Sequence, residues 1–145
     1  AYTLVDDEDF EWLNQWKWKL DSKGYAIRQT SRKLGKRRNI YMHREIINTP
    51  LNLYTDHKNF NKLDNRRTNL RICTKRENQI HQFNSRNTSG IRGVSWSKYA
   101  NSWVVQFSPR KGIYKRFYFK DKEIAIKNYN KFVIKYYGNF AILAR

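Results

Sequence analysis

Apolar positions along this chain occur in short groups that are separated by polar, turn-prone residues. In the first third, acidic residues precede aromatic ones, which predicts a short helix that begins near Asp6. Two apolar-containing segments, 16–20 and 25–29, flank four turn-prone residues and predict a hairpin. A further ordered segment is expected over 41–47. The N-terminal part is interpreted as a small sheet, and residues 1–50 as a bracing region.

The next segment, residues 51–82, is unusually polar but has ordered flanks. Apolar residues from Leu70 predict a strand that leads into a helix. Thr74 and Glu77 have the spacing of a capping box, which marks the start of that helix. The segment is therefore predicted to run as strand, long polar loop, strand and helix.

A polar segment at 83–89 is interpreted as a linker, and the apolar pattern changes after it. Turn-prone residues separate three predicted strands, at 91–98, 103–108 and 114–119. From Asp121 onward, apolar and aromatic residues recur every three or four positions, which predicts a helix that stops at Gly138. Residues 90–145 are thus predicted to form a three-stranded antiparallel sheet packed on one helix, and the fold class of the chain is α+β.

Charge narrows the choice of partner, because 30 Lys and Arg outnumber 12 Asp and Glu. A formal net charge of +18 and a pI near 10.2 favour a polyanion, such as nucleic acid or an anionic membrane surface. Aromatic residues reach 16%, which argues against disorder over most of the chain. We therefore expect small, aromatic-rich folded units that bind a polyanion.

Cysteine usage and hydropathy bear on the compartment. The single Cys73 excludes a disulfide framework and a four-cysteine zinc cluster, and it favours a reducing, cytosol-like environment. No apolar run approaches the length of a membrane span, and the first residues are acidic rather than basic and apolar. We expect no secretion signal and a cytoplasmic location, in a phage, prokaryotic or organellar nucleic-acid compartment.

The polar segment contains a cluster of carboxylate, amide and imidazole residues, namely Asp56, His57, Asn61, Asp64, Asn65, Asn69 and Asn78. An Asp-His pair is a natural start for metal-assisted hydrolysis, because the carboxylate can hold a hard cation and a neutral imidazole can take a proton from water. Neighbouring residues within a strand point to opposite faces, so both side chains can reach one site only where the strand ends. We therefore expect Asp56 and His57 at the end of a strand.

Residues 56–81 resemble the HNH homing-endonuclease family in four features: His57, Asp-Asn-Arg-Arg at 64–67, Asn-Leu-Arg at 69–71, and Asn78. The resemblance implies a strand-strand-helix (ββα) metal finger that hydrolyses a phosphodiester bond of duplex DNA. One departure occurs at Phe60, where relatives more often carry Gly in an Asn-Gly-Asn turn. This departure leaves the shape of the loop open more than its chemistry.

The resemblance also implies a role for each site residue. His57 would be the general base that activates the attacking water, and Asp56 and Asn78 would hold one divalent cation at the scissile phosphate. Oxygen ligands without a thiolate suit Mg²⁺ or Mn²⁺. Asn69, more a structural residue than a ligand, would tie the loop to the strands and help to orient His57. His81, one helical turn beyond Asn78, is a second-choice active-site residue.

Other residues near the cluster have plainer interpretations. His43 is interpreted as a packed histidine or one bonded to the backbone, and Cys73 as a small core residue. The side chains of Arg66, Arg67 and Arg71 form either a solvated basic face or a set of DNA-phosphate contacts.

Residues 90–141 resemble the plant ethylene-responsive-factor (APETALA-two) DNA-binding domain, from Arg-Gly-Val at 92–94 to Tyr-Gly-x-Phe-Ala at 137–141. The resemblance implies a sheet that lies in the major groove of DNA, with the helix packed behind it. Candidates for groove contacts are Arg92, Ser95, Ser97, Lys98, Gln106 and Ser108, and candidates for phosphate contacts are Lys115 and Arg116. Plant members often carry Glu-x-Arg where this chain has Gln106 and Ser108, so their base preference is not carried over.

The leading hypothesis is a metal-dependent DNA endonuclease of the homing or mobile-element kind, in which the C-terminal sheet tethers the finger to its site. We expect duplex DNA as the partner, no membrane, and a monomer or homodimer. An alternative is a DNA-binding regulator whose finger has lost activity, but intact Asp56, His57 and Asn78 argue against it. A packaging protein would explain the charge but not the polar cluster.

Overall fold

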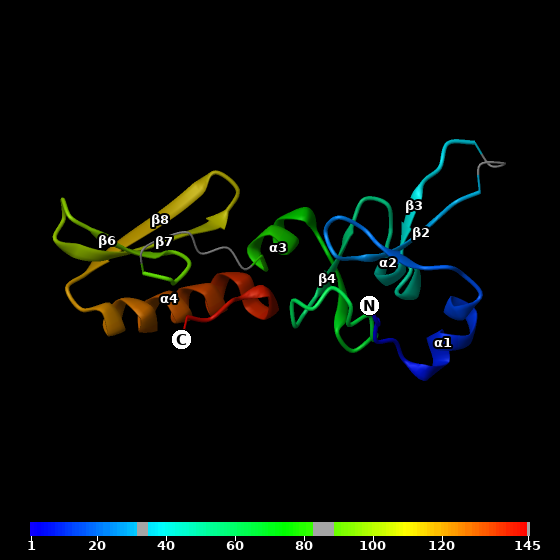
Figure 1. The fold of residues 1–145 in the computed structure, drawn as a ribbon. Helices are drawn as coiled ribbons and strands as arrows, with labels where there is room; N and C mark the ends of the chain where they lie inside the picture. Colours follow the sequence, from blue (N-terminus) through cyan, green and yellow to red (C-terminus); the bar gives the residue numbers. More distant parts are fainter. Residues whose placement is uncertain (32–34, 83–88, 145) are drawn as a thin grey trace. The chain divides into compact units, whose positions relative to one another are not determined.

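The computed structural model of this chain describes residues 1–31, 35–82 and 89–144, and they form two compact units (Figure 1). The first unit is Ala1–Asn78 and the second is Gln79–Arg145. Of the predicted linker at 83–89, residues 83–88 lie outside the described part of the chain. Within the described residues, no helix combines the length and the apolar character that a membrane span requires.

The N-terminal part of the first unit contains the predicted short helix and hairpin. Its elements are α1 (Asp7–Asn14), β1 (Lys19–Leu20), β2 (Ala26–Gln29), β3 (Asn39–Tyr41) and α2 (Met42–Ile46). The three strands pair antiparallel in the order β1-β2-β3. The turn between β1 and β2 forms because the carboxylate of Asp21 accepts hydrogen bonds from the backbone N–H groups of Lys23 and Tyr25, both at 2.9 Å.

The predicted strand, loop, strand and helix follow as β4 (Tyr54–His57), β5 (Leu70–Cys73) and α3 (Lys75–Ile80). The strands pair antiparallel, with Asp56 opposite Arg71 and His57 opposite Leu70. The predicted capping box is confirmed. The backbone N–H of Thr74 donates to Glu77 Oε2 at 2.7 Å, and the N–H of Glu77 donates to Thr74 Oγ1 at 3.2 Å.

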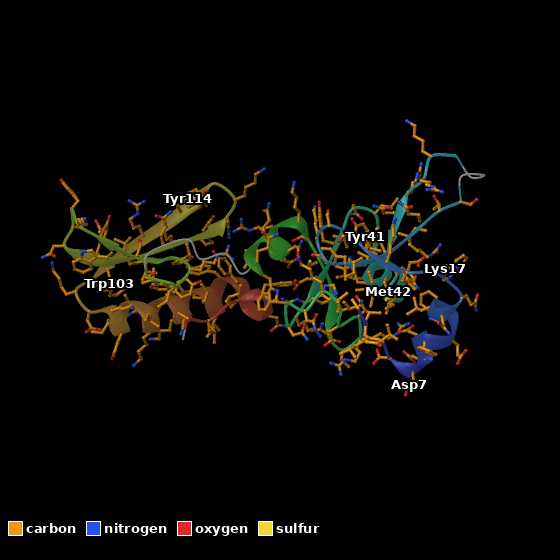
Figure 2. The ribbon with its side chains drawn as sticks, viewed as in Figure 1. Asp7, Lys17, Tyr41, Met42, Trp103 and Tyr114 are labelled. Carbon is orange, nitrogen blue, oxygen red and sulfur yellow. The ribbon has the colours of Figure 1, made fainter. Side chains whose placement is uncertain are left out.

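One buried cluster joins the N-terminal elements to the β4-β5 hairpin. It contains Leu13 from α1, Ala26 from β2, Met42 and Ile46 from α2, and Leu70 from β5. Met42 and the preceding Tyr41 lie where β3 passes into α2 (Figure 2). The N-terminal region therefore shares its core with the hairpin.

The second unit has the predicted architecture of three strands on one helix (Figure 1). Its elements are β6 (Val94–Ser97), β7 (Ser102–Arg110), β8 (Ile113–Phe119), α4 (Lys122–Tyr137) and the 3₁₀ helix η2 (Gly138–Phe140). The strands pair antiparallel in the order β6-β7-β8. Helix α4 begins at the predicted place, because Asp121 caps it by accepting a hydrogen bond from the N–H of Ile124 at 2.8 Å. The membership of this unit in a family stays a prediction.

The core of the second unit lies between one face of the sheet and α4. The sheet contributes Val94, Val105 and Phe107, and the helix contributes Ala125, Tyr129 and Val133. Trp103, labelled in Figure 2, packs at the edge of this core. Side chains of the same strands at alternate positions, including Gln106 and Arg116, lie on the face away from α4.

Gly93, just before β6, lies in close contact with two neighbouring elements. Its φ is +73°, and a Cβ placed there would lie 2.7 Å from the carbonyl oxygen of Gln106 and 2.7 Å from the ring of Tyr129. The N–H of Gln106 donates to the carbonyl of Gly93 at 2.7 Å. Only glycine allows the chain to approach β7 and α4 this closely.

Gly93→Ala is expected to lower the free energy of unfolding of the second unit by about 1–3 kcal/mol, because the new methyl group meets backbone and a buried ring. Gly112→Ala is the matched control, since Gly112 has a φ of +78° but only open space within 4 Å of where its Cβ would lie. Urea unfolding of both variants measures the difference. Equal losses would mean that backbone strain, and not the close contact, accounts for the effect.

Candidate active site

Asp56 and His57 are the last two residues of β4, as the sequence predicted. Both side chains are buried. Strand alternation sends them to opposite faces, where Asp56 lies beside Arg71 and His57 lies beside Leu70. At the end of β4, the adjacent residues Asp56 and His57 therefore have different surroundings.

The imidazole of His57 is held by the amide of Asn65. His57 Nε2 lies 3.1 Å from Asn65 Oδ1, and Asn65 Nδ2 donates to Thr3 Oγ1 at 2.8 Å. This second bond directs the oxygen of the amide toward the ring, so Nε2 is the nitrogen that carries the proton. Nδ1 is then the unprotonated nitrogen, which is the atom that can accept a proton from water.

Burial sets the charge of the same ring. His57 is 5% exposed, and this loss of solvent lowers its pKa below the ordinary value, although the bond to Asn65 and the charge of Asp56 oppose the shift. The neutral form of His57 is therefore favoured near pH 7. A neutral, oriented imidazole is what a general base requires.

Asn69 and Asn65, two amides of the polar loop, have different partners. Asn69 ties the loop, because its Oδ1 accepts from the N–H of Asn59 at 3.0 Å and its Nδ2 donates to the carbonyl of Asp64 at 2.7 Å. The amide that orients His57 belongs instead to Asn65. Both asparagines lie in the same polar loop, and their spacing alone does not show which of them crosses to the imidazole.

Asp56 is fixed by Arg71, the residue opposite it on β5. Arg71 Nε donates to Asp56 Oδ2 at 2.7 Å, and Arg71 Nη2 lies 2.7 Å from the same oxygen. Arg71 is a candidate for a DNA contact by its sequence, but its guanidinium is largely buried against this carboxylate. The two residues form a paired unit because each is the other's cross-strand neighbour.

Asn78 and Asp56 both act on the thiol of Cys73, which is a buried core residue as predicted. Burial, with the charges of Asp56 and Glu77, raises the pKa of Cys73 to about 11, and the backbone N–H of Asn78 opposes this shift. The contact of Asn78 with Cys73 is made by its backbone N–H, so it does not place the side-chain oxygen of Asn78 next to Asp56. Their oxygen donors suit a hard divalent cation.

The other titratable residues that the structure describes nearby add no metal ligand to Asp56 and Asn78. Within the described residues, no group of three or more His, Cys, Asp or Glu side chains is placed to hold a metal ion. The sequence predicts His81 one helical turn beyond Asn78, but α3 ends at Ile80 and His81 lies buried in the turn that follows.

Arg66 and Arg67, also candidates for DNA contacts, are bound to carboxylates of the same unit. Arg66 donates to both oxygens of Asp64 at 2.8 Å, and this bond holds the pKa of Asp64 at about 2. Arg67 donates to both oxygens of the buried Asp9 at 2.8 and 2.7 Å and also pairs with Glu8. The acidic run near the N-terminus supplies the partners of Arg67, and the sequence did not reveal this pairing. DNA contact by either arginine stays a prediction.

The residues predicted to bind DNA divide between the two faces of the second unit's sheet. Strand alternation places Ser95, Ser97, Gln106 and Arg116 on the face away from α4, and Arg116 donates to Gln106 Oε1 from Nε at 3.2 Å and Nη2 at 2.9 Å. Lys115 lies on the opposite face, beside Phe107, with Nζ 5.6 Å from the ring centre of Tyr136. The prediction for Lys115 overlooked that it alternates with Arg116.

Three further candidates have individual surroundings. Lys98 is exposed in the turn after β6. The backbone of Ser108 exchanges hydrogen bonds with the hydroxyl of Tyr137, next to an irregularity in the β7-β8 pairing. The guanidinium of Arg92 is bonded to the backbone carbonyl groups of Gln79, Ile80 and Gln82. The groove contact predicted for Arg92 therefore competes with bonds inside its own unit.

A cluster of rings surrounds the buried face of His57. The ring of His43 lies 5.2 Å from that of His57 and 5.1 Å from that of Tyr25, centre to centre. His43 is packed, as predicted, and its Nδ1 has no hydrogen-bond partner among the residues that the structure describes. Burial lowers the pKa of His43 to about 3.

Comparison with known proteins identifies the segment that holds these residues. The family model described as "HNH endonuclease" matches residues 49–80, which include β4, the polar loop, β5 and α3. This segment is therefore an HNH endonuclease domain, as the sequence pattern indicated. The match ends before the second unit's sheet begins.

Two relatives share more of the chain. The "Uncharacterized HNH endonuclease L560" of Acanthamoeba polyphaga mimivirus is 30% identical over 104 residues, which are 72% of this chain and 56% of that protein. "Protein 3.8" of Escherichia phage T7 is 38% identical over 55 residues, which are 37% of this chain and 46% of that protein. The matches thus span about half the length of each relative.

Among solved structures, the chain is similar to one described as "DNA binding and cleavage by the HNH homing endonuclease I-HmuI". The similarity covers 84% of this chain and 75% of that chain, with 24% sequence identity and a TM-score of 0.41.

The stability of the first unit is expected to fall as the pH is lowered from about 6.5 toward 3, because the unfolded chain takes up a proton that folded His43 does not. One such group contributes up to about 1.4 kcal/mol per pH unit. His43→Phe keeps an aromatic ring without a titrating nitrogen. The slope of its free energy of unfolding against pH should therefore be smaller by the contribution of about one proton. Urea unfolding at several pH values, followed through amide signals of the first unit, measures both slopes. Identical slopes would contradict this account of His43.

Proposed function

We propose that this protein is a metal-dependent DNA endonuclease of the homing or mobile-element kind. The observation that carries the proposal is the neutral, oriented imidazole of His57 at the end of β4, inside an HNH endonuclease domain. The net charge of +18 supports a polyanionic substrate.

His57 would act through Nδ1 as the general base. It takes a proton from a water molecule whose oxygen forms a bond to the scissile phosphorus, while the bond from phosphorus to the leaving oxygen breaks. The leaving oxygen is protonated from solvent. Asn65 supports this step in two ways, because it fixes the tautomer of His57 and stabilises the imidazolium that forms.

Asp56 and Asn78 would hold the divalent cation, Mg²⁺ or Mn²⁺, with remaining ligands from water and the phosphate. Bound there, the cation would stabilise negative charge on the leaving oxygen. The carboxylate and amide oxygen atoms suit such an ion by their chemistry. Arg71 would keep Asp56 in one orientation, since it bonds the same carboxylate.

The second unit would supply recognition of duplex DNA through the face of its sheet that is turned away from α4. The sequence of this unit contains only two acidic residues, Asp121 and Glu123, and the β7-β8 hairpin alone contributes Arg110, Lys111 and Arg116. Such a face is attracted to phosphate groups. Tethering it to the HNH domain raises the local concentration of the scissile bond, whether the protein acts as a monomer or a homodimer in a nucleic-acid compartment.

Purified protein is expected to nick or cut plasmid DNA with Mg²⁺ and to stop with excess EDTA. His57→Ala should reduce the cleavage rate by about 10²–10⁴-fold, because no other group takes the proton from water. DNA affinity, measured by fluorescence anisotropy, should stay within a few fold. A similar loss of affinity would mean that His57 is structural, and wild-type protein that binds without cutting would be a DNA-binding regulator.

Adjacent positions on β8 test the recognition face. Arg116→Ala should weaken binding to duplex DNA by about ten-fold at low salt and reduce the slope of log K against log salt by about 1. Lys115→Ala removes the same formal charge from the α4 side of the sheet, beside Tyr136, and should change neither quantity appreciably. Salt titrations of both variants compare them directly. Equal losses would rule out the face that we assign to DNA.

A further inference from the structure

Helix α3 carries Asn78, and it needs support from outside its own length. It has six residues, Lys75–Ile80, and none of them is buried. A helix this short is marginal in water, and its last carbonyl groups have no partners within the helix. Side chains that bond its two ends therefore decide whether α3 keeps Asn78 in one position.

Both ends of α3 have such a side chain. The capping box of Thr74 and Glu77 satisfies the N-terminal end. At the C-terminal end, Arg92 Nη1 donates to the carbonyl of Ile80 and, at 3.0 Å, to that of Gln82. Nη2 of the same guanidinium lies 3.4 Å from the carbonyl oxygen of Gln79. A cation at this end also interacts favourably with the helix dipole.

The backbone that carries Arg92 is itself fixed. The next residue, Gly93, leaves no room for a Cβ between the carbonyl of Gln106 and the ring of Tyr129. Its carbonyl also accepts the hydrogen bond from the N–H of Gln106. The guanidinium therefore extends to the end of α3 from a rigid base on β7 and α4.

We propose that Arg92 is a positioning residue that caps α3 and thereby holds Asn78, and that it does not read DNA bases. Two carbonyls occupy Nη1 and a third lies beside Nη2, so the paired Nη1 and Nη2 donors that would read a guanine are engaged at the end of α3. The inference rests on the proposed function only where it names Asn78 as a metal ligand.

Amide hydrogen exchange tests the cap without any activity assay. The N–H of Asn78 bonds to the carbonyl of Thr74 at 3.0 Å, so its exchange rate reports on α3. Arg92→Ala should raise this rate by about five- to ten-fold. Thr74→Ala should have a similar effect from the other end of the helix. Arg116→Ala, which removes an arginine from the sheet surface, should leave the rate unchanged.

Metal binding gives the second readout. Mn²⁺ alone, followed by electron paramagnetic resonance, should bind Arg92→Ala about ten-fold more weakly than the wild type, because Asn78 is less well placed. Arg92→Lys keeps the charge but not the fork of donors, so its exchange and Mn²⁺ affinity should lie between those of the wild type and the alanine variant. Exchange at Val105, in the core of the second unit, shows that each variant remains folded.

The opposite result is equally definite. If Arg92→Ala lowers DNA affinity as much as Arg116→Ala does, and exchange at Asn78 is unchanged, Arg92 is a DNA contact and the cap is wrong. If the wild type binds neither Mn²⁺ nor DNA, the proposed function fails. The exchange comparison then still decides the role of Arg92, because it requires no ligand.

Discussion

The loop between β4 and β5 has no regular secondary structure, and its own amide side chains supply hydrogen-bond partners to its backbone. Asn69 bonds to the backbone at Asn59 and Asp64, and the side chain of Asn59 bonds to that of Asp64 at 2.8 Å. These bonds keep the ends of the two strands together. The position of His57, the last residue of β4, depends on this closure because the loop begins directly after it.

The HNH domain is completed by residues that lie far from it in the sequence. Thr3 positions the amide of Asn65, and the N–H of Asn65 donates to the carbonyl of Leu4 at 2.8 Å. His43 packs its ring against that of His57. The family match begins at residue 49, so all three contacts come from outside the matched segment. The N-terminal region is therefore part of the site's architecture, since the imidazole would lose its orientation without it.

Local spacing was enough to predict most of the elements, because each depends on neighbours in the sequence. The segment at 41–47 was predicted only as ordered, and the structure has the helix α2 there. The capping box at Thr74 and the helix start after Asp121 are set by side chains three residues apart. The partners of the polar cluster were not predictable in this way. Arg67 meets Asp9 across 58 residues, and spacing in one sequence does not show which distant carboxylate an arginine will reach. For this reason several members of a cluster that suggested chemistry prove to serve the scaffold of the loop.

Phe60 shows how the loop keeps its shape despite a departure from the family pattern. Its φ is +64°, in the left-handed region where glycine is favoured, and its N–H donates to the carbonyl of His57 at 3.0 Å. The turn that follows His57 is thus formed at a cost of about 1–2 kcal/mol for a residue with a Cβ. A strained conformation persists only where its surroundings enforce it. The asparagine bonds around Asn59 and Asn69 provide that enforcement, so the loop's hydrogen bonding, rather than the residue at position 60, determines the geometry beside His57.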